Sequence, residues 1–195
     1  MFWTVRYWFR PQLEINRFSF VQNNSSPIRI LIIASVFSCF AAIFQSAGGF
    51  FPGIGYGISP FATLPIFISI VISIKHGFLS YFSAILLLLL LQPSELIVFT
   101  FTTGLLGITL GLTFKVFKQR FLRVSFSAVS LLCGILILIC LFKFPILGPA
   151  VTILNYEAIL VILVSSFLYC WAWAEFGLFI LNRLMIYLPA KKHNK

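Results

Sequence analysis

Long hydrophobic runs alternate with short polar or charged stretches along the whole chain. A helix needs about 20 apolar residues to cross the roughly 30 Å hydrocarbon core of a bilayer, and local thinning of the bilayer accommodates shorter runs. The pattern therefore predicts an all-α, polytopic membrane protein with six transmembrane helices. The predicted spans are 29–46, 60–74, 77–91, 96–114, 124–142 and 157–180.

Two span boundaries follow from the cost of burying charge in a bilayer. Lys75 and His76 are too polar for the middle of one long helix, so spans 2 and 3 are expected to form a hairpin that turns at 75–77. The last apolar stretch continues to Leu188. A seventh span would carry the basic C-terminus to the opposite face, so we expect span 6 to end near Ile180 and 181–188 to emerge along the cytoplasmic interface.

Positive charge lies almost entirely on one side of these spans. Of the 14 Lys and Arg residues, only Lys143 falls on the other side when the spans alternate in direction. Because cytoplasmic loops are enriched in Lys and Arg, both termini are expected in the cytoplasm. Residues 1–28 then form an interfacial cytoplasmic segment, 29–188 the six-helix membrane domain, and 189–195 a basic cytoplasmic tail.

The composition excludes a soluble globular protein. The chain is 61% hydrophobic and only 9% charged, whereas a soluble domain needs more polar residues to cover its surface. The net charge of +10 would suit nucleic acid, but the cations flank apolar runs and form no separate basic domain. The expected partner is therefore a lipid bilayer with anionic headgroups, and no nucleic acid is expected.

Residues that carry catalysis or bind metals are scarce. The chain has no Asp and four Glu, and it contains neither HExxH nor GxSxG, the patterns of metalloproteases and serine hydrolases. Its four cysteines lie within apolar runs and form no CxxC, which is typical of packing residues. We expect no enzymatic activity, no metal and no cofactor.

Two carboxylates have two interpretations each. Glu157, at the external start of span 6, either stabilises the helix N-terminus or accepts a ligand. Glu175 follows Trp171 and Trp173 closely in the sequence and precedes Phe176. It is an intramembrane residue, and so a functional candidate, if the span is shifted inward, and an interfacial residue otherwise.

Small residues at helical spacing predict two surfaces where another helix approaches closely, in this chain or in a partner. The surface in span 1 consists of Ala34, Ser38 and Ala42. The surface in span 4 consists of Gly104, Gly107 and Gly111, the last two forming a GxxxG motif.

Residues 46–60 are uncharged and contain five glycines and two prolines. Such a composition is not expected to continue a helix. The segment is either a flexible external connector or a loop that folds over the mouth of an outward-facing pocket.

The order of the predicted spans and loops along the chain resembles that of the S components of energy-coupling factor (ECF) transporters. The resemblance rests on six helices with both ends inside, a long apolar external loop after span 1, a tight turn with Gly77 between spans 2 and 3, and the span 1 stripe. In this stripe Ser38 replaces the central Ala of an AxxxA-like arrangement. The resemblance implies capture of a small, vitamin-like solute at a bacterial plasma membrane.

The resemblance also implies partners and a binding region. The partners would be a transmembrane coupling protein, which contacts the span 1 stripe, and ATPase subunits. The external loops of the family close over the substrate. By position, this implicates Phe50, Phe51, Tyr56, Gln92, Glu95, Asn155, Tyr156 and Glu157 in binding the small-molecule substrate.

The layout also resembles the D-type membrane subunit of the bacterial cell-elongation machinery, which is a scaffold and not a carrier. The proline–aspartate pair usual near the second helix of that subunit is absent, since the chain has no Asp. A non-transport membrane scaffold or assembly protein is the alternative function.

Overall fold

The described part of the chain consists of helices and the turns between them. The computed structural model describes residues 7–8, 26–51, 53–143 and 156–187, with side chains to Leu184 in the last helix. The elements are α3 (Pro27–Phe50), α4 (Ile54–Ile58), the 3₁₀ turn η1 (Ser59–Ala62), α5 (Thr63–Ile72), α6 (Ile74–Leu91), α7 (Pro93–Phe101), α8 (Thr103–Val116), α9 (Arg120–Cys140) and α10 (Tyr156–Tyr187).

Six segments of the described chain are long and apolar enough to cross a membrane. They are α3, the α4–α5 segment, α6, the α7–α8 segment, α9 and α10. The prediction of an all-α chain with six such segments is therefore confirmed.

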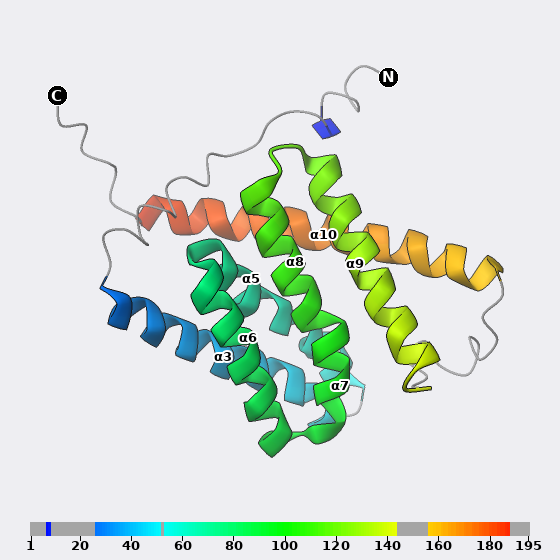
Figure 1. Cartoon of the computed structure of the whole chain (residues 1–195), viewed down its shortest axis with the longest axis horizontal. Helices are drawn as coiled ribbons and strands as arrows, with labels where there is room; N and C mark the ends of the chain where they lie inside the picture. The colour runs from blue at the N-terminus through cyan, green and yellow to red at the C-terminus, as the bar shows by residue number, and fades with distance from the viewer. Residues whose placement is uncertain (1–6, 9–25, 52, 144–155, 188–195) are drawn as a thin grey trace.

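The ends of the six segments lie on two opposite sides of the bundle. In Figure 1 the α8–α9 turn lies at the top, and the start of α3, the α5–α6 junction and the end of α10 lie on the left. The α6–α7 turn lies at the bottom, the end of α9 at the lower right and the start of α10 on the right. The α7–α8 segment is the most buried of the six and α10 the least. The side that holds the α8–α9 turn is called the basic end below, and the opposite side the outer end.

Several helix bounds differ from the predicted ones. Span 1 continues as helix to Phe50, and residues 54–62 are helical too, so most of the segment 46–60 is not the irregular loop predicted for it. The hairpin between spans 2 and 3 turns at Ser73, where the backbone is extended, and Gly77 lies inside α6. A Cβ on Gly77 would lie 2.6 Å from the backbone of Ile70, so glycine there allows α5 and α6 to pack closely.

Two further differences concern spans 4 and 6. Span 4 is broken at Thr102, whose φ of −121° and ψ of −87° separate α7 from α8. Span 6 shows no break near Ile180. It corresponds to α10, which has 32 residues and ends at Tyr187. At 1.5 Å per residue this helix is about 48 Å long, so it exceeds the hydrocarbon thickness and must tilt or protrude.

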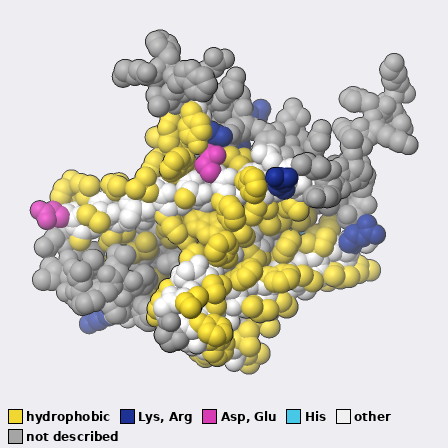
Figure 2. Space-filling view, turned by 180° about the vertical axis from the view of Figure 1, so that it is seen from behind, with side chains coloured by type: hydrophobic (Ala, Val, Ile, Leu, Met, Phe, Trp, Pro, Cys, Tyr) yellow, Lys and Arg dark blue, Asp and Glu magenta, His cyan; other side chains and the backbone are white. Residues whose placement is uncertain are grey.

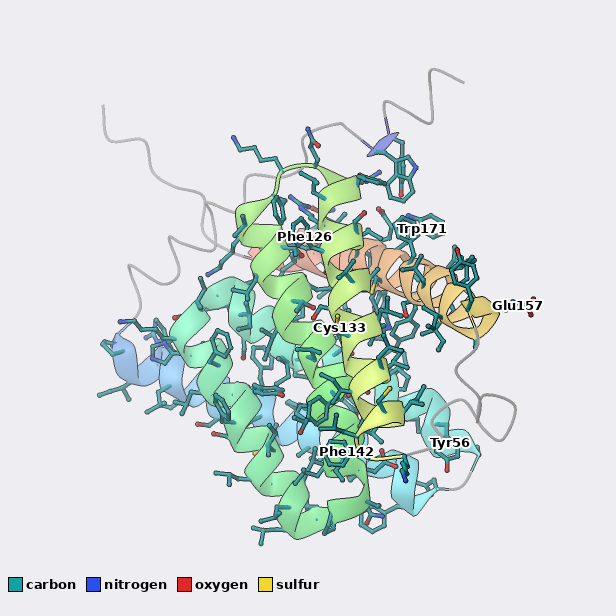
Figure 3. All side chains as sticks on the ribbon, turned by 45° about the vertical axis from the view of Figure 1, so that its right-hand side comes forward. Tyr56, Phe126, Cys133, Phe142, Glu157 and Trp171 are labelled. Carbon is teal, nitrogen blue, oxygen red and sulfur yellow. The ribbon has the colours of Figure 1, made fainter. Side chains whose placement is uncertain are left out.

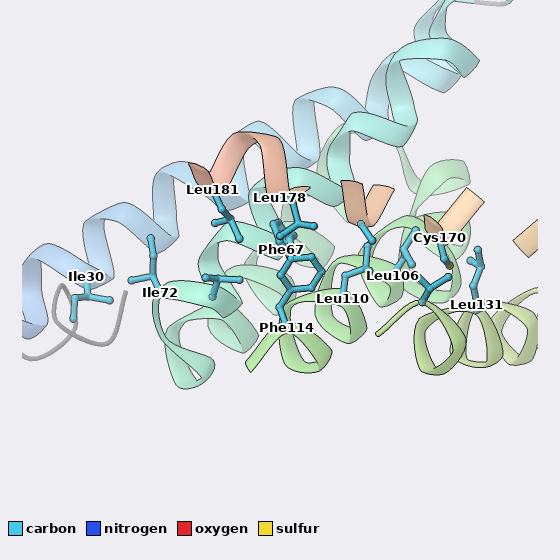
Figure 4. Packing of buried hydrophobic residues seen from close by; sticks show 14 residues of the cluster. Ile30, Phe67, Ile72, Leu106, Leu110, Phe114, Leu131, Cys170, Leu178 and Leu181 are labelled. Atoms are coloured by element: carbon cyan, nitrogen blue, oxygen red, sulfur yellow. The ribbon is translucent and has the colours of Figure 1, made fainter. Parts of the chain in front are cut away.

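The core is apolar and is built around α5 and α8. Phe67 of α5 and Phe114 of α8 pack edge to face with ring centroids 5.1 Å apart, within a cluster that extends to α9 and α10 (Figure 4). The glycines of span 4 permit this packing, because Cβ atoms at Gly107 and Gly111 would lie within 3 Å of Ile66 and Ile70. The GxxxG face of α8 is thus a contact surface for α5 of the same chain.

The surface is unusually apolar. Large hydrophobic side chains such as Leu90, Ile54 and Leu141 are at least 75% exposed, and hydrophobic side chains dominate the described part of the face in Figure 2. Soluble monomers rarely present continuous apolar patches of this extent. Such a surface is suited to contact with lipid chains.

Replacing Gly134 by alanine is expected to destabilise the bundle by about 1–3 kcal/mol, because overpacking of this kind forces backbone shifts. A Cβ on Gly134 of α9 would lie 1.9 Å from the backbone oxygen of Phe101, at the break in span 4. Gly57→Ala is the control, since nothing lies within 4 Å of a Cβ there. Denaturant unfolding in detergent micelles measures both free energies, and equal stability of the two variants would contradict the described packing.

Candidate solute-binding site

A buried glutamine connects three helices in the outer part of the bundle. Gln45 lies in the penultimate turn of α3, and its side chain is fully buried. Its Nε2 donates to Oε2 of Glu95 over 2.8 Å, and its Oε1 accepts from Oγ1 of Thr103 over 2.6 Å. Glu95 belongs to α7 and Thr103 to α8, so both ends of the amide are held and its orientation is fixed.

Glu95 is directed across the bundle and not toward its own helix. It is the third residue of α7, after Pro93, where a glutamate side chain commonly returns to the N-cap backbone N–H. The backbone N–H of the N-cap residue, Gln92, donates to the backbone oxygen of Leu88 instead, and the Gln92 side chain makes no capping hydrogen bond. The carboxylate reaches α3 instead, and its Oε1 has no hydrogen bond within the described residues.

Two glycines in the last turn of α3 make room for these side chains. A Cβ on Gly48 would lie 3.1 Å from Oε1 of Glu95, and a Cβ on Gly49 would lie 2.2 Å from Nε2 of Gln92. Gln92 also donates to Ser94 over 3.1 Å. The glycine pair therefore serves to dock the polar α6–α7 turn against α3, and the helix continues through it.

The break in span 4 lies directly beside this network. Thr103, which donates to Gln45, is the first residue of α8, and Tyr81 of α6 donates to the backbone oxygen of Thr100 over 3.0 Å. Interrupted helices within membranes tend to occur where backbone and side-chain polar groups line a binding site. Here the interruption directs Glu95 and Thr103, from different helices, to the same glutamine.

A further buried hydroxyl belongs to a residue that contacts α8 one turn after Thr103. Thr63, the first residue of α5, is 1% exposed, and its Oγ1 has no hydrogen-bond partner within the described residues. A Cβ on Gly107, one turn after Thr103, would lie 2.8 Å from the backbone oxygen of Thr63. Buried polar atoms are normally paired, so the α3–α5–α8 junction has unused hydrogen-bonding capacity.

The structure brings together only part of the set of residues implicated by the resemblance. Gln92 and Glu95 contact the end of α3, as the closing of loops 1–2 and 3–4 requires. Phe50, Phe51 and Tyr56 lie nearby in sequence but are all more than half exposed. No described contact joins their rings to Glu95.

The start of span 6 lies apart from this network. Tyr156 is 80% exposed, and Figure 3 shows Glu157 at the free end of α10, away from Tyr56 on α4. Asn155 lies outside the described residues. A site that includes Glu157 is therefore not assembled in this arrangement, and its position at the first turn of α10 suits stabilisation of the helix N-terminus.

The small-residue stripe of span 1 is buried within the chain. Ala34, Ser38 and Ala42 are at most 3% exposed, on a helix that packs mainly along α6. Their contact partner is therefore in the same molecule. In this arrangement they are not available for contact with a coupling protein, which is the role that the resemblance implies for them. Gly104 of the second stripe packs on Tyr81 and Phe99.

A second polar cluster lies at the basic end. Glu175 of α10 pairs with Arg120, the first residue of α9, over 3.3 Å, and this favours the interfacial interpretation of Glu175. The Arg120 guanidinium lies 4.0 Å from the ring centroid of Tyr7, whose hydroxyl accepts from Trp171 over 3.3 Å. Burial raises the pKa of Tyr7, so its phenol stays neutral at physiological pH.

Gln45 and Thr103 are the site residues that the sequence analysis did not select. A signal was present, because a glutamine within an apolar span is costly and therefore a functional candidate. The partners of Gln45 are 50 and 58 residues away in sequence, and only the fold brings them together.

No group of three or more potential metal ligands occurs in the described residues. Comparisons with protein-family models, curated proteins and solved structures found no match.

Proposed function

We propose that this protein is a multi-pass membrane subunit that captures a small solute at its outer end. The observation that carries the proposal is Gln45, fully buried among apolar helices and hydrogen-bonded at both ends of its amide. Polar residues inside a membrane are costly and usually mark substrate or ion sites. In the proposed orientation the α8–α9 turn lies in the cytoplasm, because all described Lys and Arg residues except Lys143 belong to segments at that end.

The remaining parts of the proposal follow from this placement. The sequence has no nucleotide-binding motif, so uptake driven by ATP would require partner subunits. A coupling membrane protein with ATPase subunits would supply that function, as in the ECF transporters that the chain resembles. Since the span 1 stripe is buried, the coupling protein would bind another face. The least buried segment, α10, offers the most exposed apolar surface for it.

The same exposed face of α10 supports the alternative function, a membrane scaffold or assembly protein. α10 packs mainly on α9 and only slightly on α5. A helix with so little contact to its own bundle has surface free for another membrane helix. A scaffold does not need a solute, so solute binding distinguishes the two functions.

Thermal unfolding of the purified protein with a panel of water-soluble vitamins and their precursors tests the proposal, since a bound solute raises the unfolding temperature. We expect at least one solute to do so for the native protein and not for Thr103→Val, which removes the hydroxyl that orients Gln45. Thr109→Val is the matched control on the same helix, because the Thr109 hydroxyl bonds only to carbonyls of its own helix. Absence of any stabilising solute, or equal loss in both variants, would favour the scaffold.

A further inference from the structure

Glu95 carries a negative charge that no described cation neutralises. Its carboxylate accepts from the neutral amide of Gln45 and makes no ion pair within the described residues. The carboxylate is partly buried, so solvent screens its charge less than that of an exposed residue. The carboxylate oxygen Oε1, beside Gly48, is left for another donor.

The last turn of α3 adds to this negative potential. The carboxylate lies against Gly48, two residues before the end of α3. The C-terminal end of a helix carries the negative end of its dipole, which is best balanced by a cation. The last turn of α3 contains no basic residue. The Glu95 carboxylate therefore lies beside the C-terminal turn of α3, and neither has a counter-charge among the described residues.

The first turn of α7 stabilises the charge of Glu95, but it does not remove the excess negative potential beside α3. A carboxylate in the first turn of a helix is stabilised by the positive end of the helix dipole, and Glu95 lies in the first turn of α7. A glutamate whose only role was to stabilise α7 would be expected to bond to the N-terminal N–H groups of that helix. Its side chain instead accepts a hydrogen bond from Gln45 of α3.

We infer that the solute site is selective for an organic cation with N–H donors, such as a primary ammonium group. The ammonium would donate to Oε1 of Glu95 and be favoured by the C-terminal end of α3. The neutral part of the solute would lie toward the exposed rings of Phe50, Phe51 and Tyr56, whose faces also attract cations. This inference rests on the proposed capture function and specifies its substrate class.

Matched pairs of amines and alcohols test the charge requirement directly. Tyramine and benzylamine carry an ammonium group at neutral pH, and tyrosol and benzyl alcohol have the same framework with a hydroxyl. Binding is measured by isothermal titration calorimetry to the full-length protein in detergent micelles. We expect the amines to bind at least about tenfold more tightly than the alcohols, which corresponds to one charge-assisted hydrogen bond.

The variant Glu95→Gln separates charge from shape. It keeps a side-chain oxygen that accepts from Gln45, so the fold is retained, but it removes the negative charge. Amine binding should weaken at least about tenfold, whereas Glu157→Gln, at the exposed start of α10, should leave it unchanged. Equal binding of amines and alcohols, no binding of either amine, or amine binding that survives Glu95→Gln would each overturn the inference.

These outcomes are distinguishable from failure of the capture function itself. A neutral vitamin that stabilises the native protein but not Thr103→Val would support solute capture while contradicting cation selectivity. If no vitamin, amine or alcohol binds, the capture function fails as a whole.

Discussion

A cysteine placed at Tyr56 should react with a membrane-impermeant maleimide added to intact cells, whereas a cysteine at Lys118 should react only after lysis. Tyr56 lies on α4 at the outer end, and Lys118 lies in the α8–α9 turn at the basic end. Both side chains are exposed, so accessibility to the reagent depends on the side of the membrane. Because the orientation follows from the distribution of Lys and Arg, the expected effect is all or none.

The native cysteines must be replaced first, since Cys39, Cys133 and Cys140 are exposed on the helices. Serine or alanine at these positions provides the background for the two single-cysteine variants. Lys143→Cys, just beyond α9, is a second outer position and should behave like the variant at Tyr56. Labelling at position 118 in intact cells would show that the orientation is reversed or that α8 and α9 do not form two successive spans.

Replacing Gln45 by leucine is expected to destabilise the bundle by about 2–3 kcal/mol. Leucine keeps most of the volume but leaves the Thr103 hydroxyl and the Glu95 carboxylate without their partner. A buried donor or acceptor that loses its partner costs about 1–3 kcal/mol, and more when it is charged. Denaturant unfolding in micelles measures the change in the free energy of unfolding.

Gln92→Leu provides the matched control, because Gln92 is less buried and bonds only to exposed Ser94. Its effect should be clearly smaller than that of Gln45→Leu, because leucine can still pack against Gly49 and only a hydrogen bond to an exposed serine is lost. Adding Thr103→Val to Gln45→Leu should cost less than Thr103→Val alone, since the hydroxyl has already lost its acceptor. Strict additivity of the two changes would contradict the hydrogen bond between these residues.

The six apolar segments were predictable because hydrophobic run length is a local property. Their ends were less predictable, since they depend on contacts with distant residues. Glycines lower helix propensity by about 1 kcal/mol each, which is why the helix was predicted to end before Gly48 and Gly49. The structure continues α3 through both because Glu95 and Gln92 pack against them.

The candidate site shows the same limit. Gln92 and Glu95 were selected from their position in an external turn, and the fold places them against α3. The break at Thr102 has no obvious local signal, since no glycine or proline occurs within it. It becomes understandable only when Tyr81 is seen to donate to the backbone oxygen of Thr100, and Thr103 to Gln45.

The aromatic contacts of α10 give the protein two separable optical reporters. The indoles of Trp8 and Trp171 lie 6.5 Å apart at the basic end, beside Tyr7. Trp173, two residues on, instead packs against Phe61 of η1, with ring centroids 5.7 Å apart. Emission from Trp8 and Trp171 will report on the attachment of the N-terminal residues to α10, and emission from Trp173 on movement of η1 relative to α10. Variants that keep only one of the four tryptophans therefore allow fluorescence to follow two different contacts of the middle of α10 independently, without any external dye.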